Sequence, residues 1–206
     1  MSARVFTPNI KVEHVVSFSD AVFAFAITLM ALSIDIPELP LDLSQSQLLD
    51  RLSSLYPQLE DYIISFAIIA MFWVSYHRVF NHIEGSYMSI VYLNLLFLLL
   101  ITLLSLTTSI VINYSSYQIP HIIYSVVVIM TSSLLAAIWW YVTKNHRLVD
   151  KNMHPLFIKG IFFILLSVPI IFGISIIISF IDLDLAQYFW LGIIPLNVLI
   201  RYKYKH

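Results

Sequence analysis

Six long apolar stretches constrain the possible folds of this chain more than any other feature. They lie at residues 15–36, 62–80, 88–112, 120–142, 156–181 and 186–201. A helix that crosses a bilayer needs about 20 mostly apolar residues. Hydrophobic residues make up 60% of the 206 and charged residues only 11%, against about 25% charged in a soluble domain. We therefore predict an all-α integral membrane protein, with one six-helix membrane domain over 1–206.

Two of these stretches carry additional signals. The residues before the first stretch do not have the layout of a secretory signal peptide, so we expect that stretch to be kept as a span. The sixth stretch is the shortest and contains Pro195. Because proline cannot donate a helical hydrogen bond, we expect a kink there.

The basic residues predict the orientation of the chain. Cytoplasmic segments of membrane proteins carry an excess of Lys and Arg. With both termini in the cytoplasm, the cytoplasmic side holds every basic residue except Arg51: Arg4, Lys11, Arg78, Lys144, Arg147, Lys151, Lys159, Arg201, Lys203 and Lys205. The outer loops hold Glu38, Asp42, Asp50, Glu60, Asp61, Asp182 and Asp184. We interpret this acidic side as a mildly cation-attracting surface.

The outer loop 37–60 is not featureless. Pro40 and Pro57 bracket a segment in which leucines recur at helical spacing: Leu48, Leu49, Leu52 and Leu55. We predict one or two short outer helices that lie against the membrane domain.

Several classes of function lack their motifs. The sequence contains no His-Glu-x-x-His, no Gly-x-Ser-x-Gly and no phosphate-binding glycine loop. It has no cysteine for disulfides or thiolate metal sites, and its net charge of -1 does not suggest a nucleic-acid partner. We predict a protein that is not an enzyme and that needs no cofactor.

The first span contains polar residues where they are costly. Ser19 and Asp20 follow Phe18 inside the apolar run. An ionised side chain at the middle of a spanning helix costs about 2.5–3.5 kcal/mol, and less near the interface. We expect these two residues to form a cap or hydrogen bonds between helices near the cytoplasmic surface, rather than to coordinate an ion directly.

The second span offers partners for them. Trp73, His77 and Asn81 recur every four residues and share one helix face. An antiparallel helix would bring them to the depth of Asp20, which predicts a buried Asp–His–Asn–Trp network. His82 is interpreted as an interfacial anchor. No carboxylate is spaced with His77 to complete a tight metal site.

A six-span chain whose first helix begins with Phe-Ser-Asp resembles the transmembrane protein 175 family, the endo-lysosomal potassium channels and their bacterial relatives. The second span is similar through Phe72-Trp73, His77-Arg78 and Phe80, and the third through Asn94-Leu95-Leu96 and residues 103–108. The similarity is densest at residues 14–32 and 66–82 and weakest in the last three spans.

The resemblance implies a cation leak channel that favours potassium without the usual carbonyl filter, and the sequence has no Thr-Val-Gly-Tyr-Gly. A chain with one repeat resembles the bacterial members. It is therefore expected in the plasma membrane as a homotetramer, with the bilayer and its own copies as partners and potassium as the permeant ion. The first helices would line a central pore.

The resemblance also assigns pore residues. The constriction falls five residues after the motif aspartate, at Phe25, and the next pore positions are Thr28, Leu29 and Leu32. At about 100° per residue these positions form one stripe. The helix is apolar all round, so periodicity alone does not select this stripe, and without the resemblance we would interpret these residues as lipid-facing or core residues. We expect hydrophobic gating at Phe25 and transient K⁺ coordination near the Thr28 hydroxyls.

Two positions depart from the family pattern. His14 stands where the family usually has an arginine, four residues before the motif phenylalanine, and histidine titrates near neutral pH. Phe25 stands where a branched aliphatic residue is usual. Its rings could close the pore more tightly or offer their faces to a cation.

Three alternatives stay open. Protons could be conducted through the same pore. A secondary transporter would need broken helices and polar groups at mid-membrane. A non-conducting membrane scaffold would bind a stable partner and show no flux.

Overall fold

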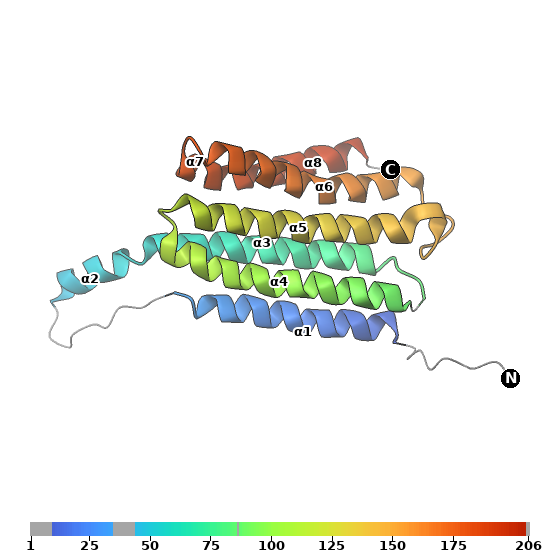
Figure 1. Ribbon diagram of the computed structural model, residues 1–206, viewed down its shortest axis with the longest axis horizontal. Coiled ribbons are helices and arrows are strands. Elements are labelled where there is room, and N and C mark those ends of the chain that lie inside the picture. The colour runs from blue at the N-terminus through green and yellow to red at the C-terminus, as the bar shows by residue number, and fades with distance from the viewer. Residues whose placement is uncertain (1–9, 35–43, 86, 205–206) are drawn as a thin grey trace.

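The described part of this computed structural model comprises residues 10–34, 44–85 and 87–204, and it contains helices and no strands. Five long helices lie side by side along one axis (Figure 1). They are α1 (Val12–Ala31), α3 (Tyr56–Phe80), α4 (Met88–Tyr114), α5 (Gln118–Thr143) and α6 (Pro155–Ile178). The last crossing consists of α7 (Leu183–Tyr188), the 3-10 turn η2 (Phe189–Gly192) and α8 (Ile193–Lys203). The prediction of six membrane spans is confirmed, since six segments are long and apolar enough to cross a bilayer.

The bilayer explains why these stretches are helical, because a helix satisfies its own backbone hydrogen bonds where no water is available. Local signals set several of the ends. Pro155 opens α6, and the His154 Nδ1 atom accepts a hydrogen bond from the Leu156 amide at 3.3 Å. The Asp182 side chain accepts from the Leu185 amide at 2.9 Å and caps α7. The helix α3 begins at Tyr56, so the second span starts six residues before the expected residue 62.

The sixth span is interrupted close to Pro195. The chain forms a 3-10 turn over Phe189–Gly192, and α8 begins at Ile193. A proline ring clashes with the carbonyl group four residues earlier, which here belongs to Leu191 inside that turn. The distortion expected from the sequence therefore takes the form of a local tightening of the helix on the N-terminal side of the proline.

The outer loop contains one described helix, α2 (Gln45–Ser53), which Ser44 opens with a capping box. None of its side chains is buried, and it extends beyond the end of the bundle (Figure 1). The expectation that the outer helices lie against the membrane domain is therefore wrong for α2. Only residues 54–55 separate it from α3, so the chain has little length in which to fold back. Pro40 and the rest of 35–43 lie outside the described residues.

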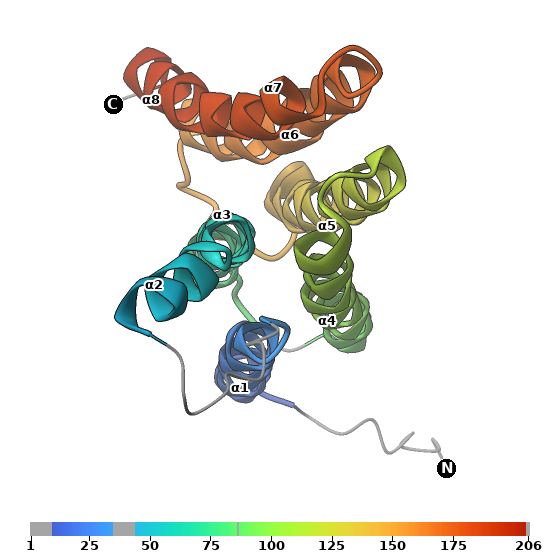
Figure 2. The ribbon, with the colours of Figure 1, turned by 90° about the vertical axis from the view of Figure 1, so that its left-hand side faces the viewer.

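Viewed along the helices, α5 lies between two groups, with α1, α3 and α4 on one side and α6 to α8 on the other (Figure 2). Polar side chains bond across the α5–α6 contact. The Ser132 hydroxyl donates to the Leu165 carbonyl at 2.7 Å, and the Trp139 indole N–H donates to the Ile158 carbonyl at 2.9 Å. Such bonds stabilise helix association in membranes, where apolar burial alone provides little driving force.

Stacked aromatic rings hold the interrupted sixth span in place. The Trp190 ring stacks on His121 at 5.0 Å, on Phe172 at 4.9 Å and on Tyr124 at 5.2 Å between centroids. The Trp190 indole N–H also donates to the Ser175 hydroxyl at 2.8 Å. Trp190 therefore joins the break of the sixth span to both α5 and α6, and the bonds from Ser167 to Asn197 at 2.9 Å and from Ser175 to the Ala186 carbonyl at 2.7 Å add to the contact with α6.

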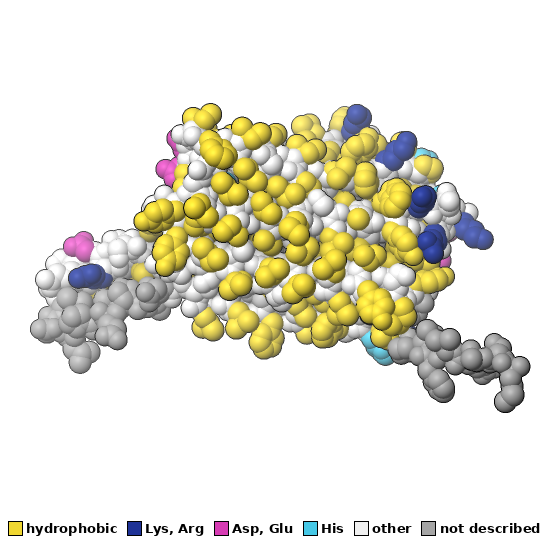
Figure 3. Space-filling view, in the orientation of Figure 1, with side chains coloured by type: hydrophobic (Ala, Val, Ile, Leu, Met, Phe, Trp, Pro, Cys, Tyr) yellow, Lys and Arg dark blue, Asp and Glu magenta, His cyan; other side chains and the backbone are white. Residues whose placement is uncertain are grey.

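On the face of the bundle that Figure 3 shows, charged side chains gather at the two ends and the surface between them is mostly apolar. Most of the visible Lys and Arg side chains lie at the end where α1 begins and α8 ends. Arg51 lies on α2 beyond the opposite end. This distribution is the one that an even number of spans with a basic side requires.

We expect Trp139→Phe to lower the free energy of unfolding by about 1 kcal/mol, because it removes one hydrogen bond between membrane helices. Trp140→Phe is the matched control, since Trp140 is 53% exposed and its replacement keeps a ring under Lys144. Unfolding in mixed micelles by titration with dodecyl sulfate measures both. Equal losses from the two variants would contradict this account of the α5–α6 contact.

Candidate functional site

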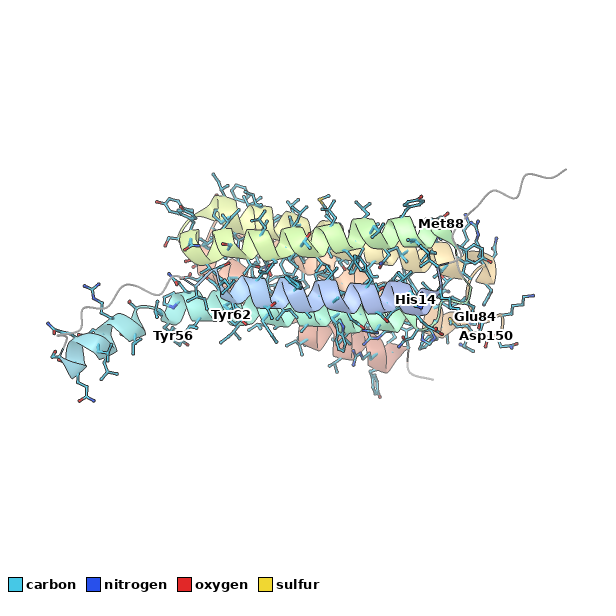
Figure 4. The ribbon with its side chains drawn as sticks, turned by 90° about the horizontal axis from the view of Figure 1, so that it is seen from below. His14, Tyr56, Tyr62, Glu84, Met88 and Asp150 are labelled. Atoms are coloured by element: carbon cyan, nitrogen blue, oxygen red, sulfur yellow. The ribbon has the colours of Figure 1, made fainter. Side chains whose placement is uncertain are left out.

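The helix α1 has two distinct faces. One face is buried in the bundle and consists of Val15, Ser19, Phe23, Ala26 and Met30. The opposite face carries the residues expected to line a pore: Phe25 is 67% exposed, Leu29 50% and Leu32 80%. Thr28 is exposed on the same face. Figure 4 shows α1 on the outside of the bundle, in front of α3 and α4.

A buried hydrogen-bond cluster at Ser19 joins α1 to its two neighbours. The Tyr76 hydroxyl of α3 donates to Ser19 Oγ at 2.8 Å, and the Asn94 side-chain amide of α4 donates to the same oxygen at 3.0 Å. The Ser19 hydroxyl in turn donates to the Val15 carbonyl at 2.8 Å. Because all three polar side chains are buried, these bonds are costly to break and they fix one rotation of α1.

Asp20 bonds to α3 just beside this cluster. The Trp73 indole N–H donates to Asp20 Oδ1 at 2.8 Å, and His77 Nε2 lies 2.8 Å from the same oxygen. The rings of Trp73 and His77 meet edge to face at 4.6 Å. Asp20 is 43% exposed and His77 24%, so this pair lies at the edge of the bundle, and the expectation that the network is buried is wrong for it. Its carboxylate serves as an acceptor between helices, as expected from the sequence.

Aromatic packing continues the contact along α1. The Phe23 ring lies 5.8 Å from Tyr76 and 6.1 Å from Phe97, and Tyr76 stacks on Phe80 at 4.1 Å. Beyond these rings, the Ser105 hydroxyl of α4 donates to the Ala26 carbonyl at 2.9 Å. The helix α1 is therefore anchored over several turns, and its exposed stripe is held in one direction.

The structure brings together only part of the expected network. Ser19, Asp20, Trp73 and His77 meet, whereas Asn81 does not join them. Asn81 follows the end of α3 and is exposed, about one turn beyond His77. The predicted network around Asp20 therefore contains Trp73 and His77 but not Asn81.

Two other expected members of the motif network point away from it. Phe18 is 55% exposed and lies on the outer face of α1. His14 is also exposed, at the start of the helix (Figure 4). It precedes Asp20 by six residues, about 9 Å along the axis. The expectation that these two side chains belong to the Asp20 network is therefore wrong for this fold.

Sequence reasoning missed two central members of the cluster, Tyr76 and Asn94. Asn94 appeared only as part of the family resemblance, although a lone amide in an apolar run is itself a signal, because buried polar groups in membrane helices need partners. Tyr76 gave no such signal, since tyrosine is also common at membrane interfaces. Only the packing shows that its hydroxyl points at Ser19.

A shallow apolar groove of about 360 Å³ runs beside the exposed stripe, between α1 and α4. Its lining residues are Phe18, Ala21, Val22, Phe25, Ala26, Leu29, Thr102 and Ser105. The Thr28 hydroxyl donates to the carbonyls of Ala24 at 2.9 Å and Phe25 at 3.0 Å. Because its proton is directed at its own helix, the oxygen lone pairs of Thr28 stay available to a cation outside the helix.

At the acidic end, hydrogen bonds tie α3 to α7. The Gln187 side-chain amide donates to Asp61 at 2.7 Å, and the Tyr188 hydroxyl donates to Glu60 at 2.7 Å. These residues and Asp184 line an open pocket of about 350 Å³. In the described part of the chain, no group of His, Asp and Glu side chains is arranged to hold a metal ion.

Comparison with known proteins agrees with this geometry. The family model described as endosomal/lysosomal potassium channel TMEM175 matches residues 14–104, the part that contains the Ser19 and Asp20 contacts. A potassium channel of Streptomyces collinus is 29% identical over 144 residues, 68% of each chain. One of Chamaesiphon minutus is 27% identical over 139 residues, 66% of this chain and 68% of the relative.

Solved structures share the whole fold. The crystal structure of a lysosomal potassium-selective channel TMEM175 homolog from Chamaesiphon minutus superposes with a TM-score of 0.75 at 22% identity, over 95% of this chain and 98% of that one. A variant of the potassium channel MtTMEM175, crystallised with a nanobody fusion protein, gives 0.66 at 18% identity, over 100% and 99%. These structures confirm the fold, and the family model and the curated relatives confirm the resemblance to this family. The expectation that the chain is not an enzyme agrees with these relatives, which are channels.

We expect Ser19→Ala to lower the free energy of unfolding by about 1–3 kcal/mol, because it leaves the Tyr76 hydroxyl and the Asn94 amide buried without their acceptor. Ser17→Ala is the control, since the Ser17 hydroxyl is exposed and bonds only to the Glu13 carbonyl of its own helix. Denaturant titration in micelles compares the two. A loss no larger for Ser19→Ala than for Ser17→Ala would show that the cluster does not anchor α1.

Proposed function

Because the chain is related to the TMEM175 potassium channels, we propose that it is one subunit of a potassium-favouring cation leak channel, with α1 from four copies around a central pore. The observation that carries the proposal is the rotation of α1. Its hydrogen bonds to α3 and α4 turn the stripe of Phe25, Thr28, Leu29 and Leu32 out of the protomer. That stripe is free to meet its symmetry copies, and closed rotational symmetry is the rule for such assemblies.

The proposed barrier is a ring of Phe25 side chains. A narrow apolar ring sheds water, and an ion can pass only when the ring widens enough to rehydrate. Phe25 is the largest side chain among the four stripe residues and is 67% exposed in the protomer. It is thus free to reach toward a central axis, while the buried Phe23 two positions earlier serves the packing of the protomer.

The proposed coordination site lies one turn further along. Thr28 hydroxyls, one from each copy, would present oxygen lone pairs to a cation that has lost part of its hydration shell. The bonds to the Ala24 and Phe25 carbonyls hold each hydroxyl in this direction. Potassium sheds water at a lower cost than sodium, so a ring of few and weak oxygen ligands favours potassium modestly.

The membrane arrangement follows from the charges. We propose that the basic end of the bundle is cytoplasmic, in a bacterial plasma membrane, with both termini on that side. The acidic pocket of Glu60, Asp61 and Asp184 then faces outward, where it would raise the local cation concentration. The whole chain would act as one six-helix unit within the tetramer.

Proton conduction through the same pore is a second candidate. His14 precedes Phe25 by eleven residues, so the two lie on nearly the same line of α1. His14 is exposed and would stand at the cytoplasmic mouth of the pore. A secondary transporter is less favoured. A transporter needs a broken helix whose polar groups are available to a substrate, and the sixth span is broken. The polar side chains of His121 and Trp190 at that break, however, already bond to Ser175.

We expect Phe25→Ala to raise potassium flux into liposomes about tenfold, the effect of lowering a barrier by about 1.4 kcal/mol. Phe180→Ala is the matched control, because Phe180 is 71% exposed but follows the end of α6, away from α1. Parallel fluxes of potassium, sodium and protons are measured for each variant. No flux in the unmodified protein, or equal flux from Phe25→Ala and Phe180→Ala, would overturn the pore assignment.

We expect Thr28→Ala to lower the preference for potassium over sodium severalfold in the same liposomes, because it removes the hydroxyl oxygens from the proposed site. Thr102→Ala serves as the control, since Thr102 lies on α4 in the adjoining groove and its hydroxyl bonds to the Leu99 carbonyl. An unchanged preference in Thr28→Ala would remove the coordination site while leaving the constriction intact.

The chain has no cysteine, so a single introduced thiol reports directly on contacts between copies. We expect Leu32→Cys to form dimers on oxidation in membranes, because Leu32 is 80% exposed at the end of the stripe. Ala26→Cys should not, because Ala26 is 3% exposed and faces the interior of its own protomer. Absence of cross-linking at Leu32, together with a monomeric mass in nanodiscs, would exclude the central pore.

A further inference from the structure

Two arginines from different helices meet at one cleft near the basic end of the bundle. Arg78 lies in the last turn of α3 and Arg201 in the last turn of α8. Both line a cleft of about 340 Å³, and α6 supplies most of the remaining wall. The other lining residues are Phe157, Gly160, Ile161, Ile164 and Tyr204. The cleft belongs to α3, α6 and α8, and α8 lies across the bundle from α1 (Figure 2).

The positive charge of this cleft is not balanced by the described residues. Arg78 is partly buried, and the positive charge of Arg201 is close enough to repel it. Within residues 10–34, 44–85 and 87–204, the one ion pair is between His77 and Asp20. A cation near a helix C-terminus is favourable by itself, which explains each arginine singly. It does not explain why two of them converge on one half-buried site, where their mutual repulsion calls for an anion.

Neighbouring cations at the same end are accommodated differently. Lys144 lies over the Trp140 ring at 4.7 Å, and Arg147 lies over the Tyr141 ring at the same distance. These aromatic faces give a cation a favourable contact without any anion. Neither Arg78 nor Arg201 has such a ring contact among the described residues. The Arg78–Arg201 cleft therefore differs from the general basic surface.

The walls of the cleft are apolar away from the arginines. Phe157, Ile161 and Ile164 follow one another along α6, and that helix runs from the basic end toward the middle of the bundle. They span about 10 Å of helix. Gly160 shapes the floor, because a Cβ atom there would lie 3.0 Å from Tyr204 Cβ. The cleft thus combines a cationic mouth at the basic end of the bundle with an apolar wall that follows α6 toward the interior of the span.

We propose that the cleft between α3, α6 and α8 binds an anionic phospholipid, whose phosphate bridges the guanidinium groups of Arg78 and Arg201 and whose acyl chain lies along α6. A guanidinium group binds two phosphate oxygens through two parallel N–H···O hydrogen bonds, a bidentate geometry. The match of charge at the mouth and of apolarity along the wall selects a lipid over a free anion, which would leave the apolar part of the cleft uncovered. The site is independent of the proposed pore.

Native mass spectrometry of the full chain, released from micelles with added phosphatidylglycerol or phosphatidylcholine, tests the proposal. We expect the unmodified protein to retain phosphatidylglycerol preferentially. Arg201→Gln should weaken that retention about fivefold, and Arg78→Gln with Arg201→Gln about 30-fold, because each basic side chain contributes roughly one such factor to anionic lipid binding. Lys144→Gln is the matched control, with the same loss of charge at the same end and an expected change below about twofold.

Equal retention of the two lipids, or equal losses from Lys144→Gln and Arg201→Gln, would overturn the site in favour of general surface charge. A third arm adds inorganic phosphate, and full displacement of the lipid by phosphate would show a free-anion site instead. Arg201 is exposed, so its single variant keeps the test decisive if the double variant does not fold. Retention is measured without any ion flux, so failure here leaves the channel proposal untouched.

Discussion

The bonds from Tyr76 and Asn94 to Ser19 are the contacts on which the rest of the site depends. A single hydroxyl on α1 accepts from two neighbouring helices at 2.8 and 3.0 Å, with no water-exposed alternative for any of the three side chains. In an apolar helix, van der Waals packing alone permits several rotations of nearly equal energy. A buried polar cluster permits one. The outward direction of Phe25 and Thr28 is a consequence of that choice.

Polar groups elsewhere in the bundle follow the same logic. Ser132, Trp139 and Ser105 each donate to a backbone carbonyl of another helix, and Ser175 gathers His121 and Trp190 at the interrupted sixth span. Lipid cannot satisfy these groups, so each one specifies which helix faces which. The face of the molecule seen in Figure 3 is left apolar along the bundle, and its Lys and Arg side chains lie at the ends, where water and headgroups are available.

Much of the architecture could be predicted because the bilayer makes length and hydropathy decisive. The six spans follow from the apolar runs, and the break before Pro195 follows from proline geometry. The site was predicted in part. Asp20 pairs with Trp73 and His77 because their spacing puts them on one face at the right depth. Asn81 was misplaced because spacing does not show where a helix ends. His14 was misplaced because six residues of helix turn it to a different face from Asp20.

The sequence by itself determined that this chain crosses the membrane six times and which residues could supply polar contacts, because those properties depend on composition and period alone. Only the tertiary structure decided which face of α1 looks outward, that Tyr76 rather than Asn81 completes the cluster, and that α2 extends beyond the bundle. It alone brought Arg78 and Arg201 to one cleft, although more than a hundred positions separate them in the chain. The reason is physical: an apolar helix carries no periodic signal of its own rotation, and only its hydrogen-bond partners on other helices select one.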